Sequence, residues 1–136
     1  MISKIALTAS AIFLFGAGLA LNFFPQETAA PLGLGYALGG VLLLQVLSAA
    51  LLGMGFLNWL SKGNPMGGIY SRPLALQNFL FFGVSAVALD RAALHGTPLP
   101  AIQLTACVFT LFAVAFGWLM FFHDPISKEQ KKEPNP

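Results

Sequence analysis

Residues 33–60, GLGYALGGVLLLQVLSAALLGMGFLNWL, form a long apolar run without a single charged side chain. As one helix from Gly33 to Ser61, this run would measure about 43 Å, whereas the hydrocarbon core of a bilayer is about 30 Å thick. The segment is therefore long enough to span a membrane, provided that it tilts or that its last residues follow the interface. Trp59 and Lys62 suit such an interfacial position.

Three further apolar stretches, at about 5–24, 74–89 and 99–122, have the same character. Charged residues make up 9% of the chain, against about 25% in a soluble domain. We therefore expect an all-α fold, an antiparallel four-helix transmembrane bundle over residues 1–126, with a charged cytoplasmic tail over 127–136. The first stretch resembles a signal peptide, but its length, and Pro31 directly after Ala29 and Ala30, favour a retained span.

With four spans, the basic residues divide unequally between the two sides of the membrane. Arg91 falls in the third loop beside Asp90, and the others lie in the termini or the second loop: Lys4, Lys62, Arg72, Lys128, Lys131 and Lys132. Because cytoplasmic segments are enriched in Lys and Arg, the N- and C-termini are predicted to be cytoplasmic. No basic face could follow a phosphate backbone, so we expect membrane lipids as partners and no nucleic acid.

Small residues are expected to line the helix interfaces, because helices in lipid associate through close backbone approach. The candidate stripes are Ala6, Ala9, Ser10, Gly16, Ala17 and Ala20 in the first span, Gly35, Gly39, Ala49 and Gly53 in the second, and Gln103, Ala106, Thr110, Ala113 and Gly117 in the fourth. Phe109, Phe112 and Phe116 fall elsewhere on the fourth span and are expected to face lipid or a partner subunit. Cys107 has apolar neighbours and is expected to be an inert core residue.

Polar side chains gather where the second span ends and the third begins. The candidate ligand-binding residues of this hairpin, 58–78, are Asn58, Trp59, Tyr70, Arg72, Gln77 and Asn78. A helix N-terminus attracts anions and Arg matches phosphate geometry, so an anionic lipid headgroup is one candidate ligand. The alternative is a hydrogen-bonded turn that only fixes the hairpin. Gln45, deep in the second span, is similarly expected to form an interhelical hydrogen bond or to contact a substrate.

Catalytic and metal chemistry find little support in the pattern. His95 and His123 fall on opposite sides of the membrane, so they cannot share a haem or a metal, and no cofactor is expected. Asp90 and Arg91 are expected to form a local ion pair at the outer edge, which leaves no acid inside a span for a proton-coupled pump. No nucleophile–base pair is evident, so an enzyme is not expected.

The stretch FLNWLSKGNPMGGIYSRPLALQNFLFF, residues 56–82, resembles a family of small uncharacterised bacterial four-span integral membrane proteins with a GGIY-x-RP loop. Gly67, Gly68, Ile69, Tyr70, Arg72 and Pro73 carry that pattern here. The resemblance implies a four-helix membrane protein in a bacterial inner membrane, and it implies no activity. The general layout is also similar to that of DoxX-like four-span proteins, without their first-helix pattern.

These observations favour a binding or structural accessory component of the membrane. It would contact lipid, a second copy of itself or a larger membrane complex through the 58–78 hairpin. The alternative is an oligomeric small-solute transporter or channel with a neutral pathway lined by Gln45, Gln77, Asn78 and Gln103. A membrane enzyme acting on a lipid or quinone is a third hypothesis, disfavoured because no catalytic acid, base or metal set is visible.

Overall fold

The computed structural model describes residues 2–32, 38–63, 71–96 and 99–122, and these are entirely helical apart from short turns. The elements are α1 (Ile2–Phe23), α2 (Pro25–Ala29), the 3₁₀ helix η1 (Ala30–Leu32), α3 (Leu38–Ser61), α4 (Ser71–Leu94) and α5 (Pro100–Phe122). Four helices, α1, α3, α4 and α5, are long and apolar enough to cross a bilayer. The predicted all-α fold with four membrane spans is confirmed. Gly35, Tyr70, His123 and the tail over 127–136 lie outside the described residues.

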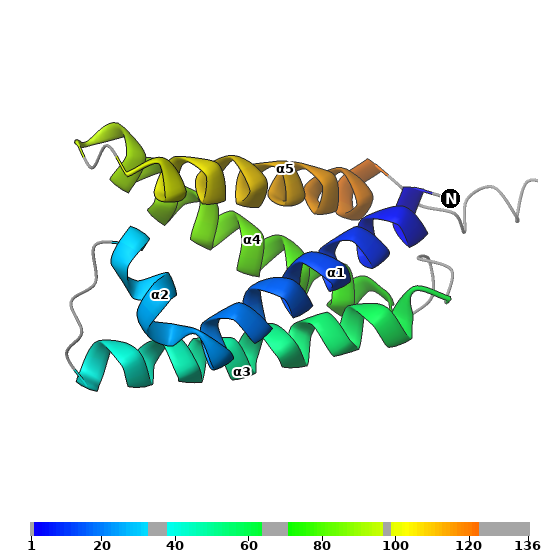
Figure 1. Ribbon diagram of the computed structural model, residues 1–136. Helices are drawn as coiled ribbons and strands as arrows, with labels where there is room; N and C mark the ends of the chain where they lie inside the picture. The colour runs from blue at the N-terminus through cyan, green and yellow to red at the C-terminus, as the bar shows by residue number, and fades with distance from the viewer. Residues whose placement is uncertain (1, 33–37, 64–70, 97–98, 123–136) are drawn as a thin grey trace, which may run out of the picture.

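The long helices pack as two antiparallel hairpins, α1 against α3 and α4 against α5 (Figure 1). The second hairpin lies above the first in this view, and α1 and α4 cross between the outer helices. The hairpins therefore diverge toward the end where α2 lies between them (Figure 1). This divergence creates the space described below.

Close backbone contact joins α1 to α3, but through other residues than the sequence suggested. A Cβ added at Gly18 would lie 2.8 Å from Cγ of Leu52, and one at Gly55 would lie 3.3 Å from the Ala11 carbonyl oxygen. By contrast, Gly16, Gly39 and Gly53 have open space around them, and Ala9 and Ala49 are exposed. The predicted stripes are therefore only partly right. Ser10 is buried and Ala6 and Ala17 pack against the core, but the five exposed or open positions miss the interface, which mixes leucines with small residues. The buried positions are Leu7, Ser10, Ala11, Leu14 and Gly18 on α1 and Leu44, Ser48, Leu51, Gly55 and Asn58 on α3.

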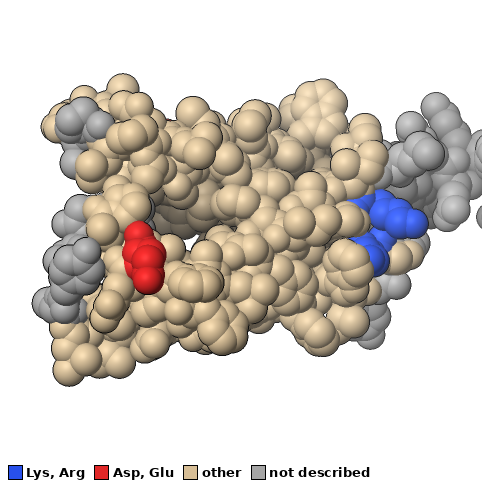
Figure 2. Space-filling view, in the orientation of Figure 1, with Lys and Arg blue, Asp and Glu red and all other residues tan. Residues whose placement is uncertain are grey.

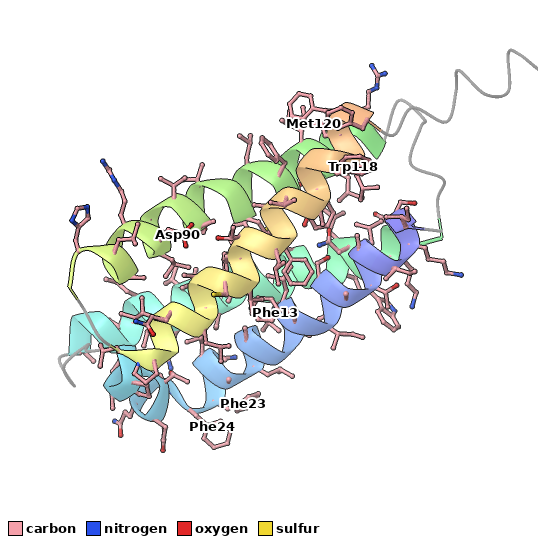
Figure 3. The ribbon with its side chains drawn as sticks, turned by 90° about the horizontal axis from the view of Figure 1, so that it is seen from above. Phe13, Phe23, Phe24, Asp90, Trp118 and Met120 are labelled. Carbon is pink, nitrogen blue, oxygen red and sulfur yellow. The ribbon has the colours of Figure 1, made fainter. Side chains whose placement is uncertain are left out.

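Phenylalanine rings pack together between α4 and α5, and Phe13 of α1 joins them from the other hairpin. Phe82 and Phe116 are fully buried and nearly parallel, with their ring planes 3° apart. The ring centroids of Phe112 and Phe82 lie 4.8 Å apart. The ring of Phe13, labelled on α1 in Figure 3, contacts the rings of Phe109 and Phe112 on α5. The expectation that the α5 phenylalanines face lipid or a partner subunit is wrong. Ring–ring contacts inside the protein stabilise these side chains more than contacts with lipid chains would. On α5, Ala106 is buried and Gly117 touches Phe79, as predicted for its small stripe, whereas Gln103 is exposed.

The outer surface of the four long helices is covered by large apolar side chains. Leu43, Leu111 and Val114 are each at least two-thirds exposed, and Figure 3 shows Phe23 and Phe24 outside the helices near the end of α1. In water such a surface would be strongly unfavourable, whereas in lipid it is matched by the acyl chains. Cys107 is exposed on this surface, so its predicted core position is wrong. The chain is a multi-pass membrane protein in contact with lipid.

Candidate functional site

The predicted hairpin site contains a buried hydrogen-bonded cluster of Ser10, Asn58 and Asn78, here called the polar clasp. Asn58 and Asn78 exchange hydrogen bonds through Nδ2 and Oδ1 in both directions, at 2.7 and 2.8 Å. The second amide hydrogen of Asn58 goes to Ser10 Oγ at 3.0 Å, and that of Asn78 goes to the Leu74 carbonyl at 3.0 Å. Ser10 in turn donates to the Leu7 carbonyl at 3.1 Å. All three side chains are fully buried.

The clasp favours one of the two interpretations that the sequence left open for Asn58 and Asn78. Each amide uses both of its hydrogens within the protein, so neither has a donor left for a ligand. A buried amide without partners would cost about 1–3 kcal/mol, so this mutual arrangement stabilises one relative placement of α1, α3 and α4. The two asparagines meet as predicted, and their hydrogen bonds fix the 58–78 hairpin, in which α4 follows α3.

The other candidate residues of this hairpin lie on the surface. Trp59, Arg72 and Gln77 are exposed, and the Lys62 ammonium lies 2.9 Å from the centroid of the Trp59 ring. Such a cation–π contact holds the ammonium at the end of α3 and suits a membrane interface. Figure 2 shows basic side chains gathered at one end of the visible face. Tyr70 lies outside the described residues, so its placement beside the others stays a prediction.

A cavity of about 610 Å³ lies between the two hairpins, here called the interhairpin cavity. Its lining comes from all four long helices and from α2 and η1, and its apolar members are Phe13, Ala17, Ala20, Leu21, Pro31, Leu44, Leu47, Leu51, Phe81, Ala88, Leu89, Ala101 and Phe109. These positions fall in the halves of the helices nearer α2, opposite the end that holds the clasp. Figure 2 shows the hollow on the visible face.

Within the described part of the chain, four polar residues also line the cavity: Glu27 and Thr28 of α2, Ser85 of α4 and Thr105 of α5. Thr28 Oγ1 donates to the carbonyls of Phe24 and Pro25, at 2.9 and 3.1 Å. Thr105 Oγ1 donates to the Ala101 carbonyl at 2.7 Å. In Figure 2 an acidic side chain lies over α2 at the edge of the hollow, and Glu27 is the carboxylate of α2. No sequence motif predicted this site, although Glu27 is the one acidic residue between the first two apolar stretches.

Asp90 lies inside a membrane-spanning helix, contrary to expectation. It falls within the candidate span Arg72–Leu94, and its Oδ2 accepts a hydrogen bond of 3.1 Å from Thr110, near the middle of α5. Figure 3 shows Asp90 between α4 and α5. Arg91 is exposed, and in the described part of the chain no ion pair joins it to Asp90. The predicted stretch ended at about residue 89, whereas the helix continues to Leu94, so the acid was placed outside the span.

The glutamines proposed for a polar pathway are all on the outside of this single chain. Gln45, Gln77 and Gln103 are exposed, and within the described residues Gln45 forms no interhelical side-chain hydrogen bond. Its backbone carbonyl accepts the Ser48 hydroxyl at 2.7 Å. Among the described residues no group of three or more His, Cys, Asp or Glu side chains could hold a metal ion.

Comparison with known proteins found no matching family model, no matching curated protein and no matching solved structure.

Proposed function

We propose that this four-span membrane protein is a binding protein that holds the apolar chain of a lipid-like amphiphile in the interhairpin cavity. One observation supports this proposal above all: the cavity is apolar, has a volume of about 610 Å³ and draws its lining from every long helix. Small-molecule sites are typically mostly apolar clefts of about 300–1,000 Å³ with a few polar groups. A surface groove between two neighbouring helices would be lined by those two helices, whereas all four long helices line this cavity.

The physical logic of such a site differs from that of a pocket in water. Lipid chains are as apolar as leucine, so the hydrophobic effect gives an apolar ligand no preference for the cavity over the surrounding bilayer. Affinity must come from dispersion contacts with the phenylalanine and leucine side chains of the wall, and from the polar residues at the α2 end. A cavity left empty forfeits the dispersion contacts on one side of every wall residue, so an occupied cavity stabilises the splayed arrangement of the hairpins.

Replacing Ala20 or Ala88, which line the cavity, by phenylalanine tests the proposal. The protein is extracted gently from the membrane and its bound lipids are counted by native mass spectrometry. We expect Ala20→Phe and Ala88→Phe to lose most of a lipid that the wild type retains with defined stoichiometry. Ala49→Phe, at an exposed position on α3, is the matched control and should retain it. Equal retention by all four proteins would refute the proposal.

A second binding function, at the hairpin formed by residues 58–78, is supported by the Lys62–Trp59 contact. The interfacial Lys62 at the end of α3 and the exposed Arg72 at the start of α4 suit an anionic lipid headgroup, or a partner protein with an acidic face. Arg72→Gln and Lys62→Gln should then lower the retention of anionic lipid relative to zwitterionic lipid. Unchanged retention would refute this second site without affecting the cavity proposal.

With these basic residues facing inward, both termini would lie in the cytoplasm of a bacterium, with the chain in its inner membrane.

The transporter alternative needs several copies of the chain. Gln45, Gln77 and Gln103 are exposed, so a neutral polar pathway could form only where the outer faces of neighbouring copies meet. A liposome flux assay with neutral solutes distinguishes this alternative from the binding function. Flux that is lost on replacing Gln45 by leucine would favour the transporter.

A further inference from the structure

The polar groups at the α2 end of the interhairpin cavity are hydrogen-bond acceptors. Glu27 contributes a carboxylate, which accepts only. The hydroxyls of Thr28 and Thr105 already donate to carbonyls of their own helices, so each has only lone pairs to offer. Among the lining residues that the structure describes, none is a lysine, arginine or histidine. A ligand headgroup placed here therefore meets one negative charge and two acceptor oxygens.

Glu27 is placed by a short, well-anchored element. Pro25 begins α2, and the backbone N–H of Thr28 donates to the Phe24 carbonyl at 3.0 Å. Ala29, at the other end of α2, is fully buried. The hydrogen bond closes the turn of α2, and packing against α1 and α3 holds this short helix at the mouth of the cavity, where Figure 2 shows the acidic side chain beside the hollow. Because α2 directly follows the end of the first span, the carboxylate lies near the membrane interface while the cavity extends to bilayer depth.

We infer that the interhairpin cavity selects an amphiphile with a cationic ammonium headgroup, which pairs with Glu27 while its apolar chain occupies the cavity. This inference rests on the proposed function and adds the headgroup chemistry. An ammonium group carries a positive charge and three donors, matching a carboxylate and two acceptor hydroxyls. A carboxylate or phosphate headgroup would instead meet like charge, and no donor among the described residues of the α2 end to compensate it.

Ser85 is the lining hydroxyl that the inference must also accommodate. It lies on α4, and no hydrogen bond within the described part of the chain engages it. Ser85 can therefore donate as well as accept, and it allows a neutral hydroxyl headgroup to bind weakly. It carries no charge, so it does not reverse the preference that Glu27 sets.

The test is a competition between three probes with the same chain: dodecylammonium, dodecanol and dodecanoate. The full chain, purified in a short-chain detergent, is incubated with an equal mixture, and the bound probe is identified by native mass spectrometry. We expect dodecylammonium to exceed dodecanoate about 1.5-fold to fivefold, the range of an exposed ion pair, since Glu27 is exposed. Glu27→Gln should abolish this preference, whereas Glu133→Gln, which changes the net charge equally, should preserve it.

The outcomes separate the two levels of the proposal. Equal binding of all three probes by the wild type, with all three excluded by Ala88→Phe, would overturn the headgroup inference and leave the cavity function standing. An ammonium preference that survives Glu27→Gln would likewise overturn it, because the charge would then be read elsewhere. No binding of any probe, or binding that Ala88→Phe does not reduce, would overturn the cavity function itself.

Discussion

Replacing Asn58 by leucine removes the centre of the polar clasp. Three hydrogen bonds are lost, one to Ser10 and two to Asn78, and a buried amide of Asn78 is left with unpaired groups. Interhelical hydrogen bonds in membranes contribute on average about 0.6 kcal/mol and up to about 1.7 kcal/mol each, and a buried unpaired polar group costs about 1–3 kcal/mol. We therefore expect Asn58→Leu to lower the free energy of unfolding by about 2–4 kcal/mol.

The double variant Asn58→Leu/Asn78→Leu separates the pairing from the packing. With both amides gone, no unpaired amide remains, and Ser10 keeps its bond to the Leu7 carbonyl. The double variant should then be less destabilised than the sum of the two single variants, with a coupling of about 1–2 kcal/mol. Unfolding of the purified protein by sodium dodecyl sulfate in mixed micelles, followed by circular dichroism, measures all the free energies under one condition.

The matched control for this cycle is Gln77→Leu. Gln77 neighbours Asn78 on the same helix but is exposed, so its replacement should change the unfolding free energy by less than about 0.5 kcal/mol. Strictly additive effects of Asn58→Leu and Asn78→Leu would refute the clasp, since additivity means that the two amides do not interact. A destabilisation by Asn58→Leu no larger than that by Gln77→Leu would refute it as well.

Three further predictions use the same unfolding assay or simple labelling. Gly18→Ala should destabilise by about 1–3 kcal/mol because its Cβ would meet a leucine of α3, whereas Gly16→Ala, with open space around it, should be neutral or slightly stabilising; equal effects would refute the α1–α3 contact. Phe116→Ala should cost about 3–5 kcal/mol and Leu111→Ala, at an exposed position, far less; the reverse order would place the α5 rings in lipid. Cys107 should react in membranes with a lipid-soluble maleimide without prior unfolding, and labelling only after unfolding would mean that it is buried.

The class of the protein and its four spans follow from the sequence because both depend on local properties. A run of about twenty apolar residues without charge determines a span, whatever it packs against. The meeting of Asn58 and Asn78 was predictable for a related reason, since they flank one short connection between two antiparallel helices. The same reasoning could not decide whether they bind a ligand or each other, because amide pairing depends on side-chain geometry.

Helix faces were harder to predict than helices. In a soluble protein, apolar side chains mark the inward face, but in lipid both faces are apolar and that signal disappears. Small residues were the remaining guide, and they were misleading for Gly16 and Gly53, which face open space, while Gly18 and Gly55 form the contact. Cys107 was misplaced for the same reason.

The interhairpin cavity is a property of the tertiary arrangement and has no sequence motif. It exists because α1 and α4 cross and the hairpins diverge from the contacts that join them, which are the clasp and the contacts of the Phe13 ring with Phe109 and Phe112. Glu27 belongs to a short helix that hydrophobic periodicity cannot predict, since Pro25–Ala29 covers little more than one turn. Its functional interest becomes visible only once the helices around it are in place.

The most direct test of the central claim is an experimental structure of the full chain crystallised from a lipidic mesophase. The account predicts an elongated density between the hairpins that begins beside Glu27 and follows the wall formed by Phe13 and Leu47. Hairpins closed on each other, with Phe81 packed against Leu47 and no room for a chain between them, would contradict it.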